Sequence, residues 1–385
     1  MNNAIADSIE ERFLEFIKRG EPPLDYERQL VRDQKKRIEA ILRGENPPPY
    51  EVEIQPSSKC NLACEHCFGK CYKRLPNLLG KKEIKRIAEE IRDFQENGFK
   101  IEVAKFCGTT GEPLLNSTIA EGIDLFREMR KKIIVFTNGL WLDQKVDGRN
   151  ETYSDCILKA DKLNLSLDAG SEETFFRIKK VHGFDRIIKS LEQLVKRREV
   201  IESKLKIIIS YVIGEENYHE VVPTTRLIKD IGADEIVFRV DFTNPENITR
   251  LSREIIGNLR AAREYRSPNF KIISPYSESE ISDEESGIFT AGGKRCFNRY
   301  FWASIGPDCN LYACGHRTHG GVRSYGNLLE KSFRELWNSE KRLKDVKDLP
   351  DEHCIICSPS SMRRNDFMTF LASLPFIESQ RLLER

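Results

Sequence analysis

The sequence has no long hydrophobic run and almost no net charge. Its longest unbroken apolar runs, 133–136 and 300–303, are four residues each, whereas a membrane span needs about 20. Sixty-two basic residues face 61 acidic ones, for a net charge of +1, and no segment has the basic excess of a nucleic-acid-binding or membrane-surface protein. The N-terminus lacks the basic and apolar regions of a secretory signal. We therefore predict a soluble cytoplasmic protein without nucleic-acid or membrane partners.

Cysteine, by contrast, is plentiful and unevenly placed. The chain has 11 cysteines in 385 residues, and an odd number without a secretory signal does not indicate a disulfide framework. Four lie at positions 60, 64, 67 and 71, five lie at 296, 309, 314, 354 and 357, and only Cys107 and Cys156 stand alone. Two groups of thiols in a reducing compartment indicate bound metal.

Hydrophobic periodicity predicts alternating strands and helices from residue 50 onward. Short β-branched runs, separated by amphipathic stretches, occupy 52–55, 101–106, 132–136, 162–167, 205–213 and 235–240. Six strands with helical crossovers favour a parallel sheet with right-handed connections. The predicted fold class is α/β: a partial (β/α)6 TIM-like barrel with its chemistry at the carboxyl ends of the strands, followed by a small C-terminal α+β domain.

The same patterns divide the chain into five segments. A polar, helical N-terminal extension is expected over 1–49, where it ends at three prolines, and the barrel core over 50–242. An acidic, serine-rich connector falls within 243–293. A hairpin followed by a helix predicts the small C-terminal domain over 294–360, and a helical tail completes the chain over 361–385.

Three cysteines lie on the loop that follows the first predicted strand. A cubane [4Fe–4S] cluster has four iron corners and is normally held by four thiolates. Cys60, Cys64 and Cys67 would hold three corners and leave one iron with an open position. An open position makes a metal reactive, just as a catalytic zinc site keeps one and a structural zinc site does not. With Cys71 as a fourth ligand the cluster would be closed and structural, and a zinc site is the other alternative.

This loop and three later motifs resemble the radical S-adenosylmethionine (AdoMet) superfamily. The C-x3-C-x2-C spacing, with His66 before the third cysteine, is similar to its signature. The run from Gly108 to Pro113 is similar to its glycine-glycine-glutamate-proline motif, but reads Thr-Thr-Gly instead of a plain Gly-Gly pair. Asn138 follows the third strand and Ser166 ends the fourth, so four matches occur in the family's order.

The resemblance implies a cofactor set and a chemistry. An open iron would chelate AdoMet, and one electron from the reduced cluster would cleave it to a 5′-deoxyadenosyl radical that abstracts hydrogen from a substrate. A flavodoxin or ferredoxin would be the electron donor. The implied cluster ligands are Cys60, Cys64 and Cys67, and the implied AdoMet-binding residues are Gly111, Glu112, Pro113, Asn138, Ser166 and Arg177, with Asn217 in a similar context. For Asn138 and Ser166 the alternative is a cap or turn at a strand end.

Three further residues lie where a substrate would bind. Cys107 precedes the glycine-rich motif near the expected barrel mouth. It is the candidate catalytic residue, as a hydrogen-atom donor or redox thiol, with a buried structural cysteine as the alternative. Arg239 and Asp241 end the sixth strand and would suit a polar or charged substrate, or else pair with each other.

The later cysteines supply enough thiolates to close a second cubane. Cys296, Cys314, Cys354 and Cys357 predict a saturated auxiliary [4Fe–4S] cluster, with structural zinc as the chemical alternative. The segment resembles the SPASM and shorter twitch modules of radical AdoMet enzymes. A full SPASM module holds two clusters and needs more than the five cysteines present here, so one auxiliary cluster is expected.

Three residues of the predicted C-terminal domain have two interpretations each. Cys309 occupies a turn position where related hairpins place glycine, because the turn favours positive φ. It is either a further ligand or a tolerated turn residue. His316 and His319 would reach a substrate or lie in a surface loop without a role.

A saturated cluster cannot readily bind substrate, which leaves electron transfer as its task and predicts a two-electron oxidation. The alternative is that the cluster only stabilises its domain.

The leading function is a radical AdoMet oxidoreductase acting on a polar small molecule of sugar, aminocyclitol or nucleotide type. The first alternative is a radical maturase of a ribosomally made peptide, by crosslinking or epimerisation. Such enzymes often carry an N-terminal winged-helix domain, which is larger than the 49 residues here. The remaining alternative, a non-catalytic iron–sulfur or zinc scaffold, is disfavoured by the intact cysteines and Glu112.

Overall fold

The computed structural model describes residues 25–70, 72–241, 243–275, 278–282, 295–348, 354, 357 and 359–384. The expectations for Cys71 and for residues 1–24 lie outside these described residues. Among the helices that the structure describes, none is long and apolar enough to cross a membrane.

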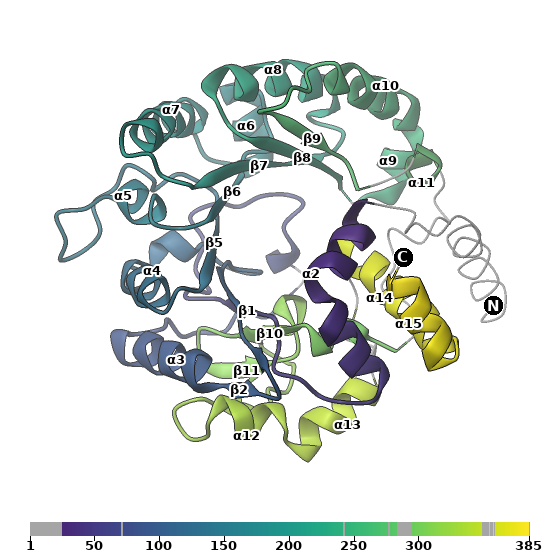
Figure 1. Cartoon of the computed structure of the whole chain (residues 1–385). Helices are drawn as coiled ribbons and strands as arrows, with labels where there is room; N and C mark the ends of the chain where they lie inside the picture. The colour runs from purple at the N-terminus through teal and green to yellow at the C-terminus, as the bar shows by residue number, and fades with distance from the viewer. Residues whose placement is uncertain are drawn as a thin grey trace.

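A single ten-stranded sheet organises the molecule (Figure 1). In spatial order its strands are β12 (Gly326–Asn327), β11 (Asn310–Tyr312), β10 (Trp302–Ile305), β1 (Glu51–Ile54), β4 (Val103–Phe106), β5 (Lys132–Thr137), β6 (Lys162–Ser166), β7 (Lys206–Ile213), β8 (Glu235–Val240) and β9 (Lys271–Ile273). All neighbours from β10 to β9 are parallel, and the sheet curls into an open arc. The prediction of a partial barrel is confirmed. A separate two-stranded ribbon pairs β2 (Gln95–Glu96) with β3 (Phe99–Lys100).

Helices cover the outside of the arc (Figure 1). In chain order they are α3 (Lys81–Asp93), α4 (Thr118–Glu128), α5 (Tyr153–Ile157), α6 (Glu172–Lys179), α7 (Phe184–Val200) and α8 (Val221–Ile231). Each presents apolar residues at helical spacing; in α3, for example, Ile84, Ile87, Ala88 and Ile91 are buried against the sheet.

The barrel strands have an apolar outer face and a polar inner face. Val52 and Ile54 of β1 are fully buried in the core beneath the helices, whereas Glu53 alternates with them and lies beside Lys105 of β4 and Ser304 of β10. Parallel strands are usually apolar on both faces. The polar interior therefore needs a separate explanation, and it is where a substrate of an enzyme with this fold class would lie.

The segment expected to be a connector, 243–293, instead continues the barrel as far as the structure describes it. It contains α9 (Pro245–Arg250), α10 (Ser252–Arg263) and α11 (Glu278–Ser282). Between α10 and α11, β9 adds a seventh parallel strand beside β8. β9 is three residues long, too short to show the alternation that predicts a strand.

The hairpin expected in a separate C-terminal domain extends the barrel sheet. β10 pairs in parallel with β1 over four residues, from Glu51↔Trp302 to Ile54↔Ile305, and β11 and β12 follow as antiparallel neighbours. α12 (Phe333–Trp337) and α13 (Glu340–Asp348) come next. The position of β10 brings the segment that carries Cys314 against the barrel.

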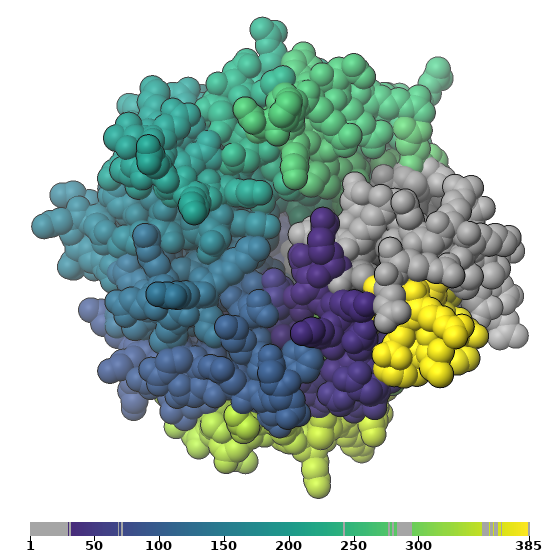
Figure 2. Space-filling view, viewed as in Figure 1, coloured from purple at the N-terminus to yellow at the C-terminus, as the bar shows by residue number. Residues whose placement is uncertain are grey.

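Helices from the two ends of the chain share a second core. α2 (Asp25–Leu42) packs against α14 (Pro359–Ser373) and α15 (Phe376–Glu384) through Ile38, Phe367 and Leu371, with Phe297 and Phe301 from the segment before β10. Figure 2 shows the purple residues of α2 seated against the yellow C-terminal helices. The helical pattern expected before residue 49 is confirmed for α2.

Candidate functional site

The first cysteine loop crosses the carboxyl end of β1, and Cys64 and Cys67 lie near enough to Cys60 to affect its ionisation. Burial raises the pKa of Cys60 to about 11, and repulsion from Glu112, Cys64 and Cys67 adds to the shift. Burial also raises the pKa of Cys64. Burial therefore disfavours free thiolates in this pocket, whereas a bound cationic metal group would stabilise them.

The glycine-rich run packs directly against this loop. Glu112 N donates to the carbonyl of Lys59 at 2.7 Å, immediately before Cys60. A Cβ on Gly111 would collide with the Ser57 carbonyl, so only glycine permits this approach. Gly111 thus lets the motif approach the backbone that leads into the cysteine loop.

The Glu112 carboxylate joins the ends of two strands. Its oxygens accept hydrogen bonds from Thr137 Oγ1 (2.6 Å), Asn138 N (2.8 Å) and Leu114 N (3.0 Å). Burial raises the pKa of Glu112, while these donors oppose the shift. A carboxylate has about four acceptor positions, so a further donor such as a ligand amino group can still be accommodated.

The structure brings most of the other predicted AdoMet residues to this same edge. Asn138 Nδ2 donates to Asn61 Oδ1 of the cysteine loop at 2.7 Å. Pro113 is buried beside Glu112, and Ser166 ends β6 next to Ser210 of β7. Arg177, in contrast, is 44% exposed on α6 and lies 3.5 Å from Glu216.

Lys179, two residues further along α6, is the buried cation near the cysteines. Its side chain is 3% exposed and pairs with Asp168, whose other partners include His66 at 3.4 Å. Burial opposes its charge, but the attraction of Asp168 and then Cys64 outweighs it and raises the pKa of Lys179. Lys179 is not predictable from its own sequence context, where the only signal is its place in the same helix turn as Arg177.

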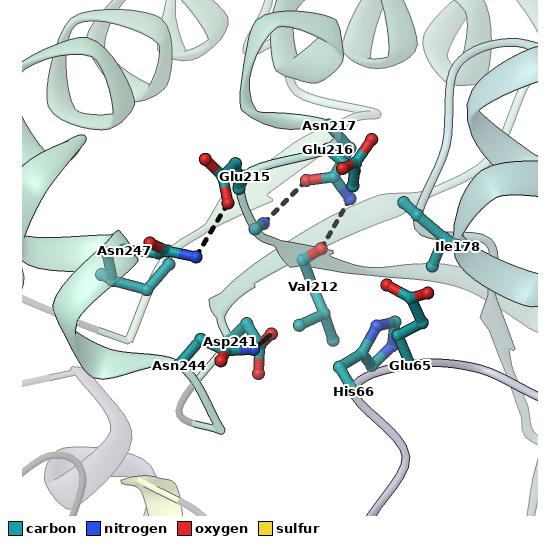
Figure 3. A pocket seen from close by; sticks show the side chains of 12 residues that line it. Glu65, His66, Ile178, Val212, Glu215, Glu216, Asn217, Asp241, Asn244 and Asn247 are labelled. Carbon is teal, nitrogen blue, oxygen red and sulfur yellow. Dashed lines mark hydrogen bonds between the residues drawn. The ribbon is translucent and has the colours of Figure 1, made fainter.

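A cavity of about 170 Å³ opens beside this loop at the ends of β7 and β8. Figure 3 shows Glu65 and His66 reaching toward it from the loop, opposite Val212 and Asp241. Asn217 also lines it, but its amide is used in folding the loop after β7: Nδ2 donates to the carbonyls of Asp168 and Val212, and Oδ1 accepts from Gly214 N. Asn217 therefore shapes this cavity.

The four auxiliary cysteines gather at a second position. Burial raises the pKa of Cys314 to about 11, and Cys296 and Cys354 repel its thiolate. Burial likewise raises the pKa of Cys357, with repulsion from Cys296, Cys314 and Cys354. Two arginines lie among these thiols. Burial opposes the charge of Arg299, but the thiolates raise its pKa, and Arg317 Nη1 donates to Cys354 Sγ at 3.7 Å.

Cys309 and Cys107 lie apart from both thiol groups. Cys309 has φ of +59°, which confirms the expected positive φ, and its thiol lies near Glu83 and Arg86 in the core. Cys107 is buried, hydrogen-bonded to Glu53, and burial raises its pKa well above its usual range. His319 stacks on Tyr72 with ring centroids 4.2 Å apart, and His316 is electrostatically linked to Glu53. Neither histidine lies in a free surface loop.

Both groups offer thiolate sulfur, the donor that holds iron–sulfur clusters. In the parts of the chain that the structure describes, no three His, Cys, Asp or Glu side chains converge closely enough to hold one metal ion. A cubane spreads its irons over separate corners and tolerates wider thiol spacing. A buried cation accompanies each group, Lys179 at the first and Arg299 at the second, and would offset the negative charge of a thiolate-bound cluster.

Comparison with known proteins gives matches over both regions. Residues 54–228 match the model of the radical SAM superfamily, and residues 296–358 match an iron–sulfur cluster-binding domain, SPASM. A probable GTP 3′,8-cyclase from Saccharolobus islandicus is 25% identical over 219 residues, 57% of this chain and 65% of that protein. The chain thus matches less than two thirds of that relative's length. A GTP 3′,8-cyclase from Clostridium perfringens is 28% identical over 334 residues, 78% of this chain and 91% of its own.

Solved structures show the same fold. Streptococcus suis SuiB bound to precursor peptide SuiA superposes with a TM-score of 0.58 at 17% identity, covering 93% of this chain and 84% of SuiB. Native anSMEcpe with bound AdoMet gives 0.55 at 15% identity, covering 88% and 98%. Together with the motifs, the family matches show a radical SAM superfamily domain over residues 54–228 and a C-terminal SPASM iron–sulfur cluster-binding domain over residues 296–358.

Proposed function

We propose that this radical SAM enzyme oxidises a polar small molecule by two electrons. The observation that carries the proposal is the charged inner face of the barrel. Lys105 Nζ lies 2.9 Å from Glu53 Oε2, Arg239 Nη1 donates to Ser210 Oγ at 2.7 Å, and Asn164 is also buried within the strands. A polar substrate can share hydrogen bonds with these groups, whereas an apolar one would exclude water from them and give no hydrogen bond in return, which is unfavourable.

When bound, a reduced first cluster and AdoMet would supply hydrogen-atom abstraction from a substrate. Cys60, Cys64 and Cys67 would hold that cluster, with Glu112, Asn138 and Ser166 toward AdoMet. The chain's own groups would orient the substrate: Lys105 can bind an anionic or hydroxyl group, and Glu53 can accept a hydrogen bond from a hydroxyl or amine. Cys296, Cys314, Cys354 and Cys357 would hold the auxiliary cluster, with a flavodoxin or ferredoxin as the outside electron donor.

Two observations support a substrate class: the polar inner face of the barrel and the names of the relatives. Acidic and basic groups are mixed along the inner face, which suits sugars, aminocyclitols or nucleotides. The curated relatives are cyclases whose name specifies a nucleotide, GTP, and this supports the nucleotide type. The likeness to SuiB with its precursor peptide keeps peptide maturation as the second candidate.

The test begins with anaerobically reconstituted, dithionite-reduced protein. We expect about eight irons per chain, two cubanes, and formation of 5′-deoxyadenosine from AdoMet, measured by mass spectrometry. A Cys60→Ala/Cys64→Ala/Cys67→Ala variant should form none and retain about four irons. Zinc in place of iron, with no AdoMet cleavage, would reject the proposal of a radical AdoMet enzyme. The non-catalytic scaffold would then be the remaining interpretation.

Deuterated candidates would then identify the substrate. A true substrate transfers deuterium to 5′-deoxyadenosine, so nucleotides, sugars and aminocyclitols can be screened alongside peptides. Transfer from a peptide alone would replace the small-molecule proposal by peptide maturation.

A further inference from the structure

A threonine of the glycine-rich motif reaches the loop of an auxiliary cysteine. Thr109 Oγ1 donates to the carbonyl of Gly315 at 2.9 Å, and Gly315 directly follows Cys314. Thr109 belongs to the Thr-Thr-Gly run by which this motif departs from the superfamily's Gly-Gly pair. A glycine at 109 has no side chain to make this bond.

Gln55 completes the connection from the end of β1. It is 1% exposed, and its Nε2 lies 3.1 Å from Thr109 Oγ1 and 3.3 Å from the Gly315 carbonyl. Its Oε1 accepts from Thr109 N at 3.3 Å. The Gln55 amide therefore binds both the glycine-rich motif and the auxiliary loop.

The auxiliary loop has little freedom to move independently of this contact. A Cβ on Gly315 would collide with the Glu53 carboxylate, so the loop backbone lies directly against this side chain of β1. Thr318 Oγ1 donates to the Cys314 carbonyl at 2.9 Å and lies 2.8 Å from Ser304 Oγ of β10. A displacement of Cys314 would be transmitted to Thr109.

The motif is equally constrained on the other side. Gly111, two residues beyond Thr109, is in contact with Ser57, and Glu112 N is bonded to Lys59. A Cβ on Gly69 of the first cysteine loop would lie 3.2 Å from Thr110 Cα. Close contacts thus run continuously from the first cysteine loop to Cys314.

We propose that Thr109 and Gln55 are positioning residues that couple the AdoMet site to the auxiliary cluster site. The inference rests on the proposed function, because it concerns the same two sites. Coupling between two binding sites is reciprocal. Because an assembled auxiliary site would hold Gly315, and through it Thr109 of the glycine-rich motif, in place, we expect it to strengthen AdoMet binding, and bound AdoMet to alter the surroundings of the auxiliary cluster.

A double-mutant cycle on the reconstituted full chain tests this coupling. The AdoMet dissociation constant is measured anaerobically by equilibrium dialysis, with and without Cys354→Ala/Cys357→Ala. We expect removal of the auxiliary cluster to weaken AdoMet binding about fivefold in the otherwise wild-type chain. In Thr109→Val the same removal should change it by less than about twofold, because the connection is already absent.

Two further variants serve as controls. Thr109→Ser retains the hydroxyl and should behave as the wild type does. Thr225→Val removes a buried hydroxyl that bonds only within α8, to the Val221 carbonyl, and should leave the coupling intact. The proposal would be overturned if removal of the auxiliary cysteines weakened AdoMet binding equally in Thr109→Val and in the wild type. It would also be overturned if that removal did not weaken binding in the wild type.

A second measurement applies if the double cysteine variant does not fold. The electron paramagnetic resonance spectrum of the reduced auxiliary cluster is recorded with and without AdoMet, in the wild type and in Thr109→Val. A shift in the wild type that is lost in Thr109→Val supports coupling, and an unshifted wild-type spectrum rejects it. Rejection with about eight irons and AdoMet cleavage intact leaves the proposed function standing, whereas failure to hold iron overturns both.

Discussion

The inner face of the barrel buries one close ion pair between neighbouring strands. Glu53 and Lys105 have side chains only 16% and 20% exposed, and Lys105 Nζ also lies 4.8 Å from the Phe136 ring centroid. Burial alone would raise the pKa of Glu53, but Lys105 outweighs it and lowers that pKa. The pair therefore stabilises the fold above the unfolded pKa of about 4.3, and this stability is lost as pH falls through the lower, folded value.

Replacing Lys105 by Met should reverse that dependence. Glu53 would lose its cationic partner and keep neutral ones such as Gln55 and Cys107, so burial would raise its folded pKa above the unfolded one. Stability would then fall as pH rises from about 5 to 7. We expect a loss of about 2–3 kcal/mol at neutral pH, measured by anaerobic denaturant unfolding. Glu53→Gln/Lys105→Met should recover most of it, and equal losses in the single and double variants would contradict this account.

Cys309 occupies a left-handed backbone position inside the core. A non-glycine residue costs about 1–2 kcal/mol there, which Cys309→Gly would relieve while giving up the burial of the thiol. Because the two effects oppose, we expect unfolding free energy to change by less than about 1 kcal/mol. Iron content should be unchanged, because the groups that act on this thiol are Glu83 and Arg86 and not the auxiliary cysteines. Loss of iron comparable to that in Cys314→Ala would make Cys309 a ligand.

At the scale of the element, two helical glycines allow the effect of helix propensity on stability to be measured separately from the effect of packing. Gly122 of α4 faces the sheet, where an added Cβ would lie 2.6 Å from Cζ of the Phe106 ring. At Gly257 of α10, none of the residues that the structure describes has an atom within 4 Å of the same position.

The same substitution should therefore have opposite effects at the two sites. Gly257→Ala should stabilise by about 0.5–1 kcal/mol, because alanine is the better helix former. At Gly122 this gain should be outweighed by overpacking against Phe106, for a net loss of about 1–2 kcal/mol. Thermal unfolding of the two variants side by side measures the difference, and stabilisation of both would show that Phe106 can move aside.

The elements that the sequence predicts are those with a local signal. The six predicted strands and their order are present, because each has a β-branched run of sufficient length bounded by turn residues. β9 was missed because Lys-Ile-Ile becomes a strand only through its pairing with β8. The pairing of β10 with β1 has no local signal either, since its partners are separated by most of the chain.

The candidate site divides in the same way. The cysteines and the Glu112 motif follow from spacing, which a sequence displays directly. The place of Lys179 in the site cannot be predicted from spacing, because it depends on the burial of this side chain beside Asp168. The departure at Thr109 was visible in the sequence, but its contact with Gly315 depends on the position of β10.

For the whole molecule, the second core joins the two ends of the chain beside the auxiliary site. Phe367 of α14 is fully buried there, in the same cluster as Phe297, the neighbour of Cys296. Phe367→Ala should cost about 3–5 kcal/mol. Because it loosens the segment around Cys296, we expect iron to fall from about eight toward about four per chain.

The matched control is Ile377→Ala on α15, where the side chain is 62% exposed. It should change stability by less than about 0.5 kcal/mol and leave the iron content unchanged. Iron and unfolding free energy are measured on the same reconstituted samples. Full iron in a strongly destabilised Phe367→Ala would show that the auxiliary site is independent of this core.

The pairing of β1 with β10 also orders events during synthesis. β1 is made early, but its partner strand ends at Ile305, about 250 residues later, which corresponds to tens of seconds at about 5–20 residues per second. Until then one edge of β1 exposes unpaired backbone groups, which favour aggregation. Since Cys314 follows β10, the first cysteine loop emerges on a barrel that is still open. Cluster insertion in the cell therefore has a defined interval in which to act, and a chaperone that covers the β1 edge would protect both the fold and the site.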